Sequence, residues 1–238
     1  MPDLITEDPH MLDQIRFAQV LASRDDPVLV TGESGTGKEH FAEILHGDRK
    51  RINRLHRGSN FVPVNVTTLQ EDLFESLVFG HLQGAFTGAT RETPGLVQQA
   101  EDGTLFLDEI GELSMSIQPK LLRFIQNKKF RKVGAAKLTN SKCRIVCSTN
   151  RDLRELVKEK KFRLDLFHRI TVFVIQTTPL RERPNDLSLY LRKTHKMPTA
   201  KAAKTADIIL EKTPLYGNYR ELQSIMARYK LMGEFIIY

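Results

Sequence analysis

The stretch VLVTGESGTGKEHFAEIL, residues 28–45, decides how this chain folds, because it joins an apolar run to a glycine-rich turn and then to a helical pattern. Gly32, Gly37 and Lys38 have the spacing of a loop that cradles phosphate groups. Glycines let the backbone turn so that successive N–H groups face an anion, and the start of a helix adds positive potential. A glycine-rich turn with a surface lysine is the plain alternative, which the flanking strand and helix disfavour. We therefore predict a phosphate-binding loop in which Lys38 reaches the β- and γ-phosphates.

One position of this loop departs from the usual form, because Glu39 stands where a serine or threonine would contact magnesium. The residues expected to surround the phosphates are Gly32, Glu33, Ser34, Gly35, Thr36, Gly37, Lys38 and Glu39. The missing hydroxyl raises the question whether the site is active, degenerate or an accident of composition.

The stretch GTLFLDEIGEL, residues 103–113, supplies the acidic half of such a site. In open α/β sheets, ligands bind at the carboxyl ends of the strands, which is where Asp108 and Glu109 are expected. We predict that Asp108 holds magnesium, directly or through water, and that Glu109 orients and polarises the attacking water. The acidic pair is a weak signal alone and a strong one together with the phosphate loop.

Short apolar runs alternate with helical patterns along most of the chain. The predicted strands are residues 27–31, 60–66, 104–110, 142–150 and 170–176. Because these runs are nearly continuous in apolar residues, they favour a parallel sheet that helices cover on both faces, which is an α/β fold. After residue 180 the sequence becomes polar and helical. We predict an α/β core at residues 1–180 and a small helical subdomain at residues 181–238.

The composition is typical of a soluble globular protein, since 40% of the 238 residues are hydrophobic and 27% are charged. No apolar run approaches the roughly 18 residues of a membrane span. The first residues lack the basic and apolar regions of a secretory signal. We therefore expect no membrane contact and a cytoplasmic location. Cys143 and Cys147 share one predicted strand, and we expect buried thiols because no His or Cys cluster joins them as metal ligands.

The net charge of +7 admits nucleic-acid binding, solubility or polyphosphate binding. The densest basic run is DRKRINRLHRGSN, residues 48–60, which the sequence favours as a solvated loop between a helix and a strand. No helix-turn-helix, zinc finger or RNA-binding motif accompanies this run. A DNA-binding module is therefore the weaker interpretation.

The hexapeptide GAFTGA, residues 84–89, surrounds one aromatic and one hydroxyl side chain with small residues, which suits an exposed contact better than a core. With GESGTGKE at residues 32–39, it makes the chain resemble the AAA+ ATPase domain of bacterial enhancer-binding proteins, the activators of sigma-54 RNA polymerase. The resemblance covers residues 1–186 and resumes at residues 217–222. It implies a P-loop NTPase fold that hydrolyses ATP with Mg²⁺. It also implies a sigma-54 contact through Gly84, Ala85, Phe86, Thr87, Gly88 and Ala89.

The resemblance answers the question that Glu39 raises, because the family commonly reads GESGTGKE. The metal is then expected to depend on phosphates, water and Asp108. The stretch VPVNV resembles the family's strand whose asparagine, here Asn65, restrains the catalytic glutamate. CSTNRDL matches the sensor segment that places Thr149 and Asn150 near the γ-phosphate, and a turn after a strand is the alternative for these two residues.

The stretch FRLDLFHRI, residues 162–170, resembles the segment that bears arginines acting on a neighbouring subunit, here Arg163 and Arg169. Such arginines stabilise charge on a transferring phosphoryl group. The resemblance therefore implies a ring of identical subunits, usually a hexamer. From their spacing alone, the two arginines would be basic residues on a solvated helix.

Two more segments match the family near the nucleotide. GNYREL, residues 217–222, implies that Arg220 approaches the nucleotide from a helical lid. Asn218 and Glu221 have the spacing of a capping pair that would hold Arg220 in the first turn of a helix. Leu4 and Ile5 match the segment that packs against adenine.

The resemblance is weakest at residues 183–217, where the chain is shorter and carries Leu215 and Tyr216 in place of the usual Trp-Pro. We predict a shortened or truncated lid. The alternative function is a regulatory fragment that binds nucleotide and is deficient in hydrolysis. The family's sensory and DNA-binding domains have no counterpart in these residues, so DNA binding is expected only through absent or separate domains.

Overall fold

The computed structural model describes residues 4–52 and 60–233. Residues 53–59 of the basic run predicted as a solvated loop lie outside the described residues. Within the described residues, no helix is long and apolar enough to cross a membrane.

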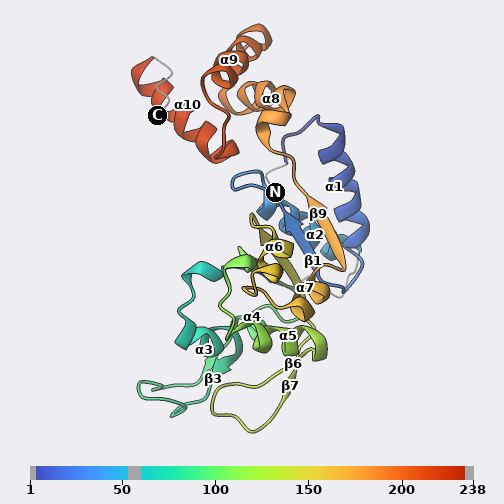
Figure 1. The fold of residues 1–238 in the computed structure, drawn as a ribbon, viewed down its shortest axis with the longest axis vertical. Helices are drawn as coiled ribbons and strands as arrows, with labels where there is room; N and C mark the ends of the chain where they lie inside the picture. The colour runs from blue at the N-terminus through green and yellow to red at the C-terminus, as the bar shows by residue number, and fades with distance from the viewer. Residues whose placement is uncertain (1–3, 53–59, 234–238) are drawn as a thin grey trace.

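A parallel sheet forms the centre of the molecule (Figure 1). Its strands, in spatial order, are β2 (Phe61–Asn65), β5 (Thr104–Asp108), β8 (Arg144–Thr149), β1 (Val28–Thr31) and β9 (Phe173–Gln176). Each falls within one of the predicted runs, so the predicted strands and the α/β class are confirmed. The register pairs Val28 with Val146 on one side of β1 and with Phe173 on the other. All five strands therefore end at the same edge of the sheet.

Both faces of the sheet are buried, which explains the continuous apolar runs. Successive side chains of a strand point to opposite faces, so Leu29 packs into one hydrophobic cluster while Val28 and Val30 pack into another. The helices α1 (Pro9–Leu21) and α2 (Lys38–Ile52) cover the second of these faces. The opposite face is covered by α3 (Phe74–Phe79), α4 (Leu96–Gln99), α5 (Gln118–Asn127), α6 (Leu153–Lys158) and α7 (Leu164–Ile170).

The C-terminal helices form a separate cluster beyond the carboxyl edge of the sheet (Figure 1, orange to red). They are α8 (Pro184–His195), α9 (Thr199–Lys212) and α10 (Asn218–Met232). Leu187, Ile209 and Leu222 are fully buried among them. The predicted boundary at residue 180 falls in the short connection between β9 and α8, at the 3₁₀ turn Leu180–Glu182.

Two hairpins project from the opposite end of the molecule (Figure 1). The first joins β3 (Gly80–His81) to β4 (Thr93–Pro94), and the second joins β6 (Lys129–Phe130) to β7 (Thr139–Asn140). Backbone hydrogen bonds connect them, from Leu82 N to the Val133 carbonyl at 3.0 Å and from Val133 N to the Gly80 carbonyl at 2.9 Å. The two hairpins therefore share one seam.

Candidate nucleotide site

The glycine-rich loop lies between the end of β1 and the start of α2, where the sequence predicts it. Gly32, Gly35 and Gly37 have φ values of 146°, 77° and 103°, which side chains rarely adopt. At Gly35 a Cβ atom would also lie 2.3 Å from the carbonyl oxygen of Gly217. Glycine is therefore required here both by backbone conformation and by the close approach of a second segment.

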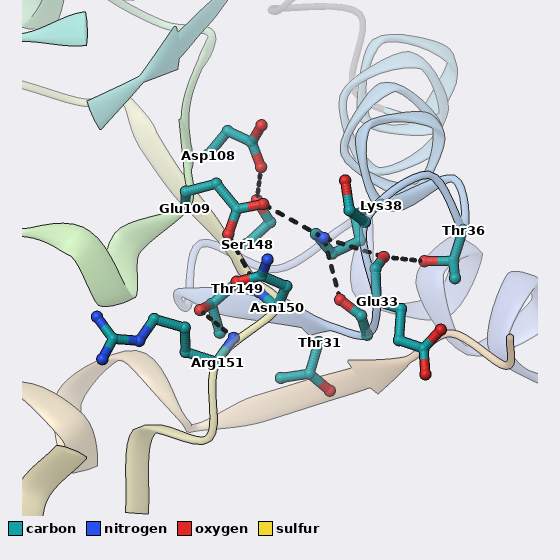
Figure 2. A network of polar contacts seen from close by, with 12 residues as sticks. Thr31, Glu33, Thr36, Lys38, Asp108, Glu109, Ser148, Thr149, Asn150 and Arg151 are labelled. Carbon is teal, nitrogen blue, oxygen red and sulfur yellow. Dashed lines mark hydrogen bonds and ion pairs between the residues drawn. The ribbon is translucent and has the colours of Figure 1, made fainter. Parts of the chain in front are cut away.

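Lys38 is the first residue of α2, and its side chain, which is almost fully buried, reaches back into this loop (Figure 2). Its ammonium group donates to the carbonyl oxygens of Gly32 at 3.0 Å and Glu33 at 3.2 Å. It also lies 3.5 Å from a carboxylate oxygen of Glu109. A buried ammonium surrounded by carbonyl and carboxylate oxygens has the partners that anionic phosphate oxygens could replace.

The two acids at the end of β5 differ in backbone conformation. Asp108 is the last residue of the strand and accepts a hydrogen bond from the Ser148 hydroxyl on neighbouring β8. Glu109 has left-handed backbone angles, with φ 57° and ψ 46°, so its side chain turns back toward Lys38. The backbone N–H of Asn150 donates to Glu109 at 3.1 Å. Strained non-glycine conformations of this kind recur at functional sites.

The predicted sensor residues lie beside these acids, at the end of β8 (Figure 2). The Thr149 carbonyl accepts from Gly32 N at 3.2 Å, and its hydroxyl accepts from Arg151 N at 3.0 Å. Asn150 meets Glu109 through its backbone rather than its side chain. These residues therefore hold the phosphate loop and the glutamate in place.

Asn65 is placed close to the acids but is not in contact with Glu109. It ends β2 directly opposite Asp108 in the strand register. Its side-chain oxygen accepts from the backbone N–H and the hydroxyl of Thr67, at 2.9 and 2.7 Å. In this structure Lys38 and Asn150 hold Glu109 instead.

A pocket of about 550 Å³ opens in front of the loop, and it brings together the predicted acidic pair, Lys38, Arg220, the predicted apolar residues and part of the loop. It is lined by Leu4, Ile5, Ser34, Gly35, Gly37, Lys38, Glu39, His40, Asp108, Glu109, Tyr190, Thr194, Tyr219, Arg220 and Gln223. Leu4 lies against Gly37, where an added Cβ would come within 3.0 Å of the leucine side chain. The pocket thus has an apolar side, a phosphate loop and an acidic pair, which suit a nucleotide.

The start of α10 docks directly on the phosphate loop. The backbone N–H of Tyr219 donates to the Gly35 carbonyl at 3.2 Å, and Arg220 donates to the Ser34 hydroxyl at 2.8 Å. The expected capping role of Asn218 is wrong, because its side chain instead donates to the Ser34 carbonyl at 3.0 Å and accepts from Leu180 N at 2.6 Å. Hydrogen bonds with residues distant in sequence therefore take the place of the predicted helix cap.

Glu221, the second residue of the expected capping pair, does bond the start of the helix. Its carboxylate accepts from Gly217 N at 2.8 Å and from the Thr213 hydroxyl at 2.8 Å. Arg220 is therefore held in the first turn of α10, as the sequence predicts, although by one side chain of the expected pair.

Sequence reasoning missed two polar contacts that attach the site to the C-terminal helices. Arg181 donates to both carboxylate oxygens of Glu33, at 2.7 and 2.6 Å. Buried Asp186 accepts from the Thr6 hydroxyl at 2.6 Å, from Glu7 N at 2.7 Å and from Arg183 at 2.8 Å. No local pattern signals the contacts of Arg181 with Glu33 or of Asp186 with Thr6 and Glu7, because these partners lie far apart in the chain.

Of the predicted trans-acting arginines, Arg163 is the N-cap residue of α7 and Arg169 lies within α7, and neither lines the pocket. Arg163 forms two hydrogen bonds with Asp165, at 3.0 and 2.7 Å, and this contact raises the pKa of Arg163 and lowers that of Asp165. Arg169 is exposed and forms no hydrogen bond or ion pair with the described residues. Within a single chain, neither arginine completes the site.

The GAFTGA residues form the tip of the β3–β4 hairpin and do not line the pocket; Gly84, Phe86, Thr87 and Gly88 are exposed, whereas Ala89 is buried. Gly84 N donates to the Ala89 carbonyl at 2.8 Å, which closes the loop. Phe86 remains 40% exposed and packs edge-on against His81, with ring centroids 5.0 Å apart. The loop thus presents an aromatic ring and the Thr87 hydroxyl to solvent.

Comparisons with known proteins agree with this fold. A family model described as the sigma-54 interaction domain matches residues 4–176. The chain is 44% identical over 217 residues to a nitric oxide reductase transcription regulator of Cupriavidus necator, covering 88% of this chain and 41% of that protein. It is 40% identical over 232 residues to an alginate biosynthesis transcriptional regulatory protein of Pseudomonas aeruginosa, covering 94% of this chain and 51% of the relative. The chain thus spans about half the length of the curated relatives it matches.

A solved structure of NtrX from Brucella abortus, in complex with ATP, aligns with a TM-score of 0.82. The sequence identity is 26%, and the alignment covers 98% of this chain and 54% of that chain. A second structure of the same protein, with ADP, aligns with a TM-score of 0.77 at 25% identity, over 97% of this chain and 52% of that one.

Proposed function

The chain belongs to the sigma-54 interaction domain family and has the AAA+ P-loop NTPase fold, and from this premise we propose that it hydrolyses ATP and uses the energy to remodel RNA polymerase that carries sigma-54. One observation carries the proposal. Lys38 and Glu109 meet at 3.5 Å in a pocket that also contains Asp108, Arg220 and an apolar wall.

ATP fits this pocket in each of its parts. Leu4 and Ile5 provide an apolar surface for the base, and the glycine-rich loop provides backbone N–H groups for the phosphates. The chain is similar to a protein whose structure contains ATP. On entry, phosphate oxygens would replace the Gly32 and Glu33 carbonyls as partners of Lys38.

Magnesium fits the acidic edge of the pocket. Mg²⁺ keeps several waters and takes one or two carboxylates plus substrate phosphates, so a site made of few protein ligands is expected. The described residues contain no cluster of three or more His, Cys, Asp or Glu side chains, which agrees with that pattern. Asp108 would hold the ion, whose charge would neutralise the phosphate oxygens. We do not propose the Thr36 hydroxyl as a magnesium ligand, because it is buried and hydrogen-bonded to the Glu33 carbonyl and to Thr177.

We propose that Glu109 activates the attacking water. Its carboxylate faces the same space as Lys38, and the Asn150 N–H fixes its orientation. Lys38 leaves this carboxylate when it binds phosphate, which frees Glu109 to accept a proton from water. A positioned base of this kind contributes about 10²–10⁴-fold to rate.

We propose that catalysis needs a second copy of the chain. Arg169 is exposed on α7 and has no anionic partner among the described residues, so it can act on the nucleotide of a neighbour. A closed ring, a hexamer by the resemblance, would give every pocket such an arginine. Arg163 would contribute after release from Asp165.

The GAFTGA loop is the proposed contact with sigma-54. Phe86 and Thr87 are exposed at a hairpin tip, closed by the Gly84–Ala89 hydrogen bond, at the end of the molecule opposite the C-terminal helices (Figure 1). Hydrolysis would move this loop against the polymerase.

The proposal is tested by measuring ATP hydrolysis against protein concentration. We expect activity per chain to rise with concentration, Lys38→Ala to lose ATP affinity, and Glu109→Gln to keep ATP affinity while losing about 10²-fold or more of its rate. Glu112→Gln is the matched control, because this acid lies three residues away and pairs with Arg151. An unmodified chain that binds ATP but shows no turnover at any concentration would support the hydrolysis-deficient alternative.

Remodelling is tested separately, by promoter opening with polymerase that contains sigma-54. We expect Phe86→Ala to abolish opening while ATP hydrolysis continues. Opening that survives this substitution would remove the loop from the mechanism.

A further inference from the structure

The net positive charge of this chain comes from one segment. Every charged residue between Glu112 and Asp152 is a lysine or an arginine. This segment includes α5 and the β6–β7 hairpin. A like-charged segment of this length costs folding free energy through self-repulsion, so it marks a surface that meets anions.

The segment folds into a groove of about 720 Å³ between α5 and the β6–β7 hairpin. Lys120, Arg123, Lys129, Arg131 and Lys132 line it. Among the described residues that line the groove, Glu75 is the one acid. The groove is separate from the nucleotide pocket, with which it shares no lining residue.

Three of the groove's cations have no anionic partner within the described part of the chain. Arg123, Lys129 and Arg131 are exposed and form no ion pair there. The other two are paired, Lys120 with Glu75 at 2.9 Å and Lys132 with Glu92 at 2.7 Å. The pair of Lys120 with Glu75 is exposed on both sides and is worth at most about 1 kcal/mol, so phosphate can compete for this lysine.

The apolar part of the groove indicates which anion it suits. The rings of Phe79, Phe124 and Phe130 line its floor but are buried, so they offer no platform for stacking unpaired bases. The groove can therefore contact a nucleic acid through its charged side chains, which suits the regularly spaced phosphates of a duplex. The groove also adjoins the GAFTGA hairpin, since Gly134 lies against Ala85 and the Val133 carbonyl bonds Leu82.

We propose that the groove between α5 and the β6–β7 hairpin binds the sugar–phosphate backbone of duplex DNA, without reading its sequence, through Arg123, Lys129 and Arg131. The choice of DNA as the polyanion rests on the proposed function, because a polymerase touched by the GAFTGA loop holds promoter DNA nearby. Anion binding by the groove is inferred independently, from its charge and its shape. This proposal differs from the expectation that DNA binding belongs only to absent or separate domains.

The test measures binding of a fluorescent duplex of arbitrary sequence to the nucleotide-free chain at increasing salt. We expect Arg123→Glu, Lys129→Glu and Arg131→Glu combined to reduce the slope of log K against log salt by about 2.7, since each lost duplex phosphate contact removes about 0.9. The matched control reverses three exposed lysines of the C-terminal helices, Lys193, Lys201 and Lys204, and should leave most of that slope.

Equal losses in the two triple variants would overturn the proposal, because they would reflect net charge alone. Binding of poly-glutamate but not duplex through the groove would overturn it as well and assign the groove to an acidic protein. A glutamine version of the groove variant, with an unchanged unfolding temperature, guards against misfolding. ATP hydrolysis is measured on the same proteins. A failure of the proposed ATPase function can then be told apart from a failure of the DNA-binding proposal.

Discussion

The guanidinium of Arg181 holds the carboxylate of Glu33 with two hydrogen bonds, of 2.7 and 2.6 Å. Glu33 belongs to the phosphate loop, and Arg181 belongs to the connection that leads to the C-terminal helices. Hydrogen bonding to Arg181 is the main cause that lowers the pKa of Glu33. The pair therefore ties the position of those helices to the loop that meets the phosphates.

We expect Arg181→Gln to lower the free energy of unfolding by about 1 kcal/mol near neutral pH, because the pair is partly exposed. Since the folded-state pKa of Glu33 is lowered, this stabilisation is present above the unfolded value of about 4.3 and is lost as the pH falls through the folded pKa. Denaturant unfolding at several pH values checks this. If the free energies of unfolding of the unmodified chain and of Arg181→Gln differ by the same amount at neutral and at acidic pH, this expectation is wrong. The control is Arg192→Gln, because Arg192 is exposed.

Gly35→Ala should weaken ATP binding and stability together. The added Cβ would meet the Gly217 carbonyl at 2.3 Å in a backbone with φ of 77°, so the loop and α10 must separate. Gly233→Ala is the matched control, because φ is 72° there and no atom lies within 4 Å of the added Cβ. We expect the control to cost about 1 kcal/mol and Gly35→Ala to cost more. Thermal unfolding and ATP titration measure both, and equal effects would refute the clash.

Asp186→Ala should be among the most destabilising single changes in the chain. Asp186 and Arg183 form an ion pair with both side chains fully buried, so removal of the acid leaves an uncompensated charge at a cost of about 3–5 kcal/mol. The double variant Arg183→Met with Asp186→Leu should recover much of this loss. A double variant as unstable as Asp186→Ala would show that the charge is not the cause.

Thr6→Val tests whether the same network positions the apolar side of the pocket, which we propose for the base of ATP. The Thr6 hydroxyl donates to Asp186, and Tyr219 donates to the Ile5 carbonyl at 3.2 Å, so α8 and α10 hold the segment that contains Leu4. We expect a higher KM for ATP with little change in kcat. A changed kcat with an unchanged KM would place the effect elsewhere.

Arg169→Ala should lower the hydrolysis rate about 10³-fold or more if the arginine acts on a neighbouring subunit. Mixing it with Lys38→Ala chains should restore part of the rate, because some interfaces then combine an intact pocket with an intact arginine. Mixtures that stay as inactive as their components would show that Arg169 acts within its own chain or not at all. Lys158→Ala, an exposed change on neighbouring α6, is the control.

The parts of this molecule that the sequence predicts well are those encoded by neighbouring residues. The strands are recognisable because burial on both faces demands continuous apolar runs, as in residues 104–108. The phosphate loop is recognisable because Gly32, Gly37 and Lys38 lie within one turn between a strand and a helix. Such signals need no knowledge of distant contacts.

The parts that could not be predicted depend on residues that meet only after folding. Asn218 has the spacing of a helix cap, but Ser34 and Leu180 offer its side chain partners that no local pattern reveals. Asn65 faces Thr67 because a neighbouring N–H is available in its own turn. The basic groove escaped notice because its cations, although they belong to one segment, alternate with apolar and polar residues, and only the folding of α5 against the β6–β7 hairpin gathers them.

The seam between the two hairpins has a mechanical consequence. Because Val133 is bonded to both Gly80 and Leu82, the tip that carries Phe86 cannot swing without taking the basic hairpin with it. In the proposed mechanism, a movement driven by ATP hydrolysis would therefore act on two ligands at once. The Phe86 tip would push against sigma-54 while the cations of the groove pull on the duplex DNA.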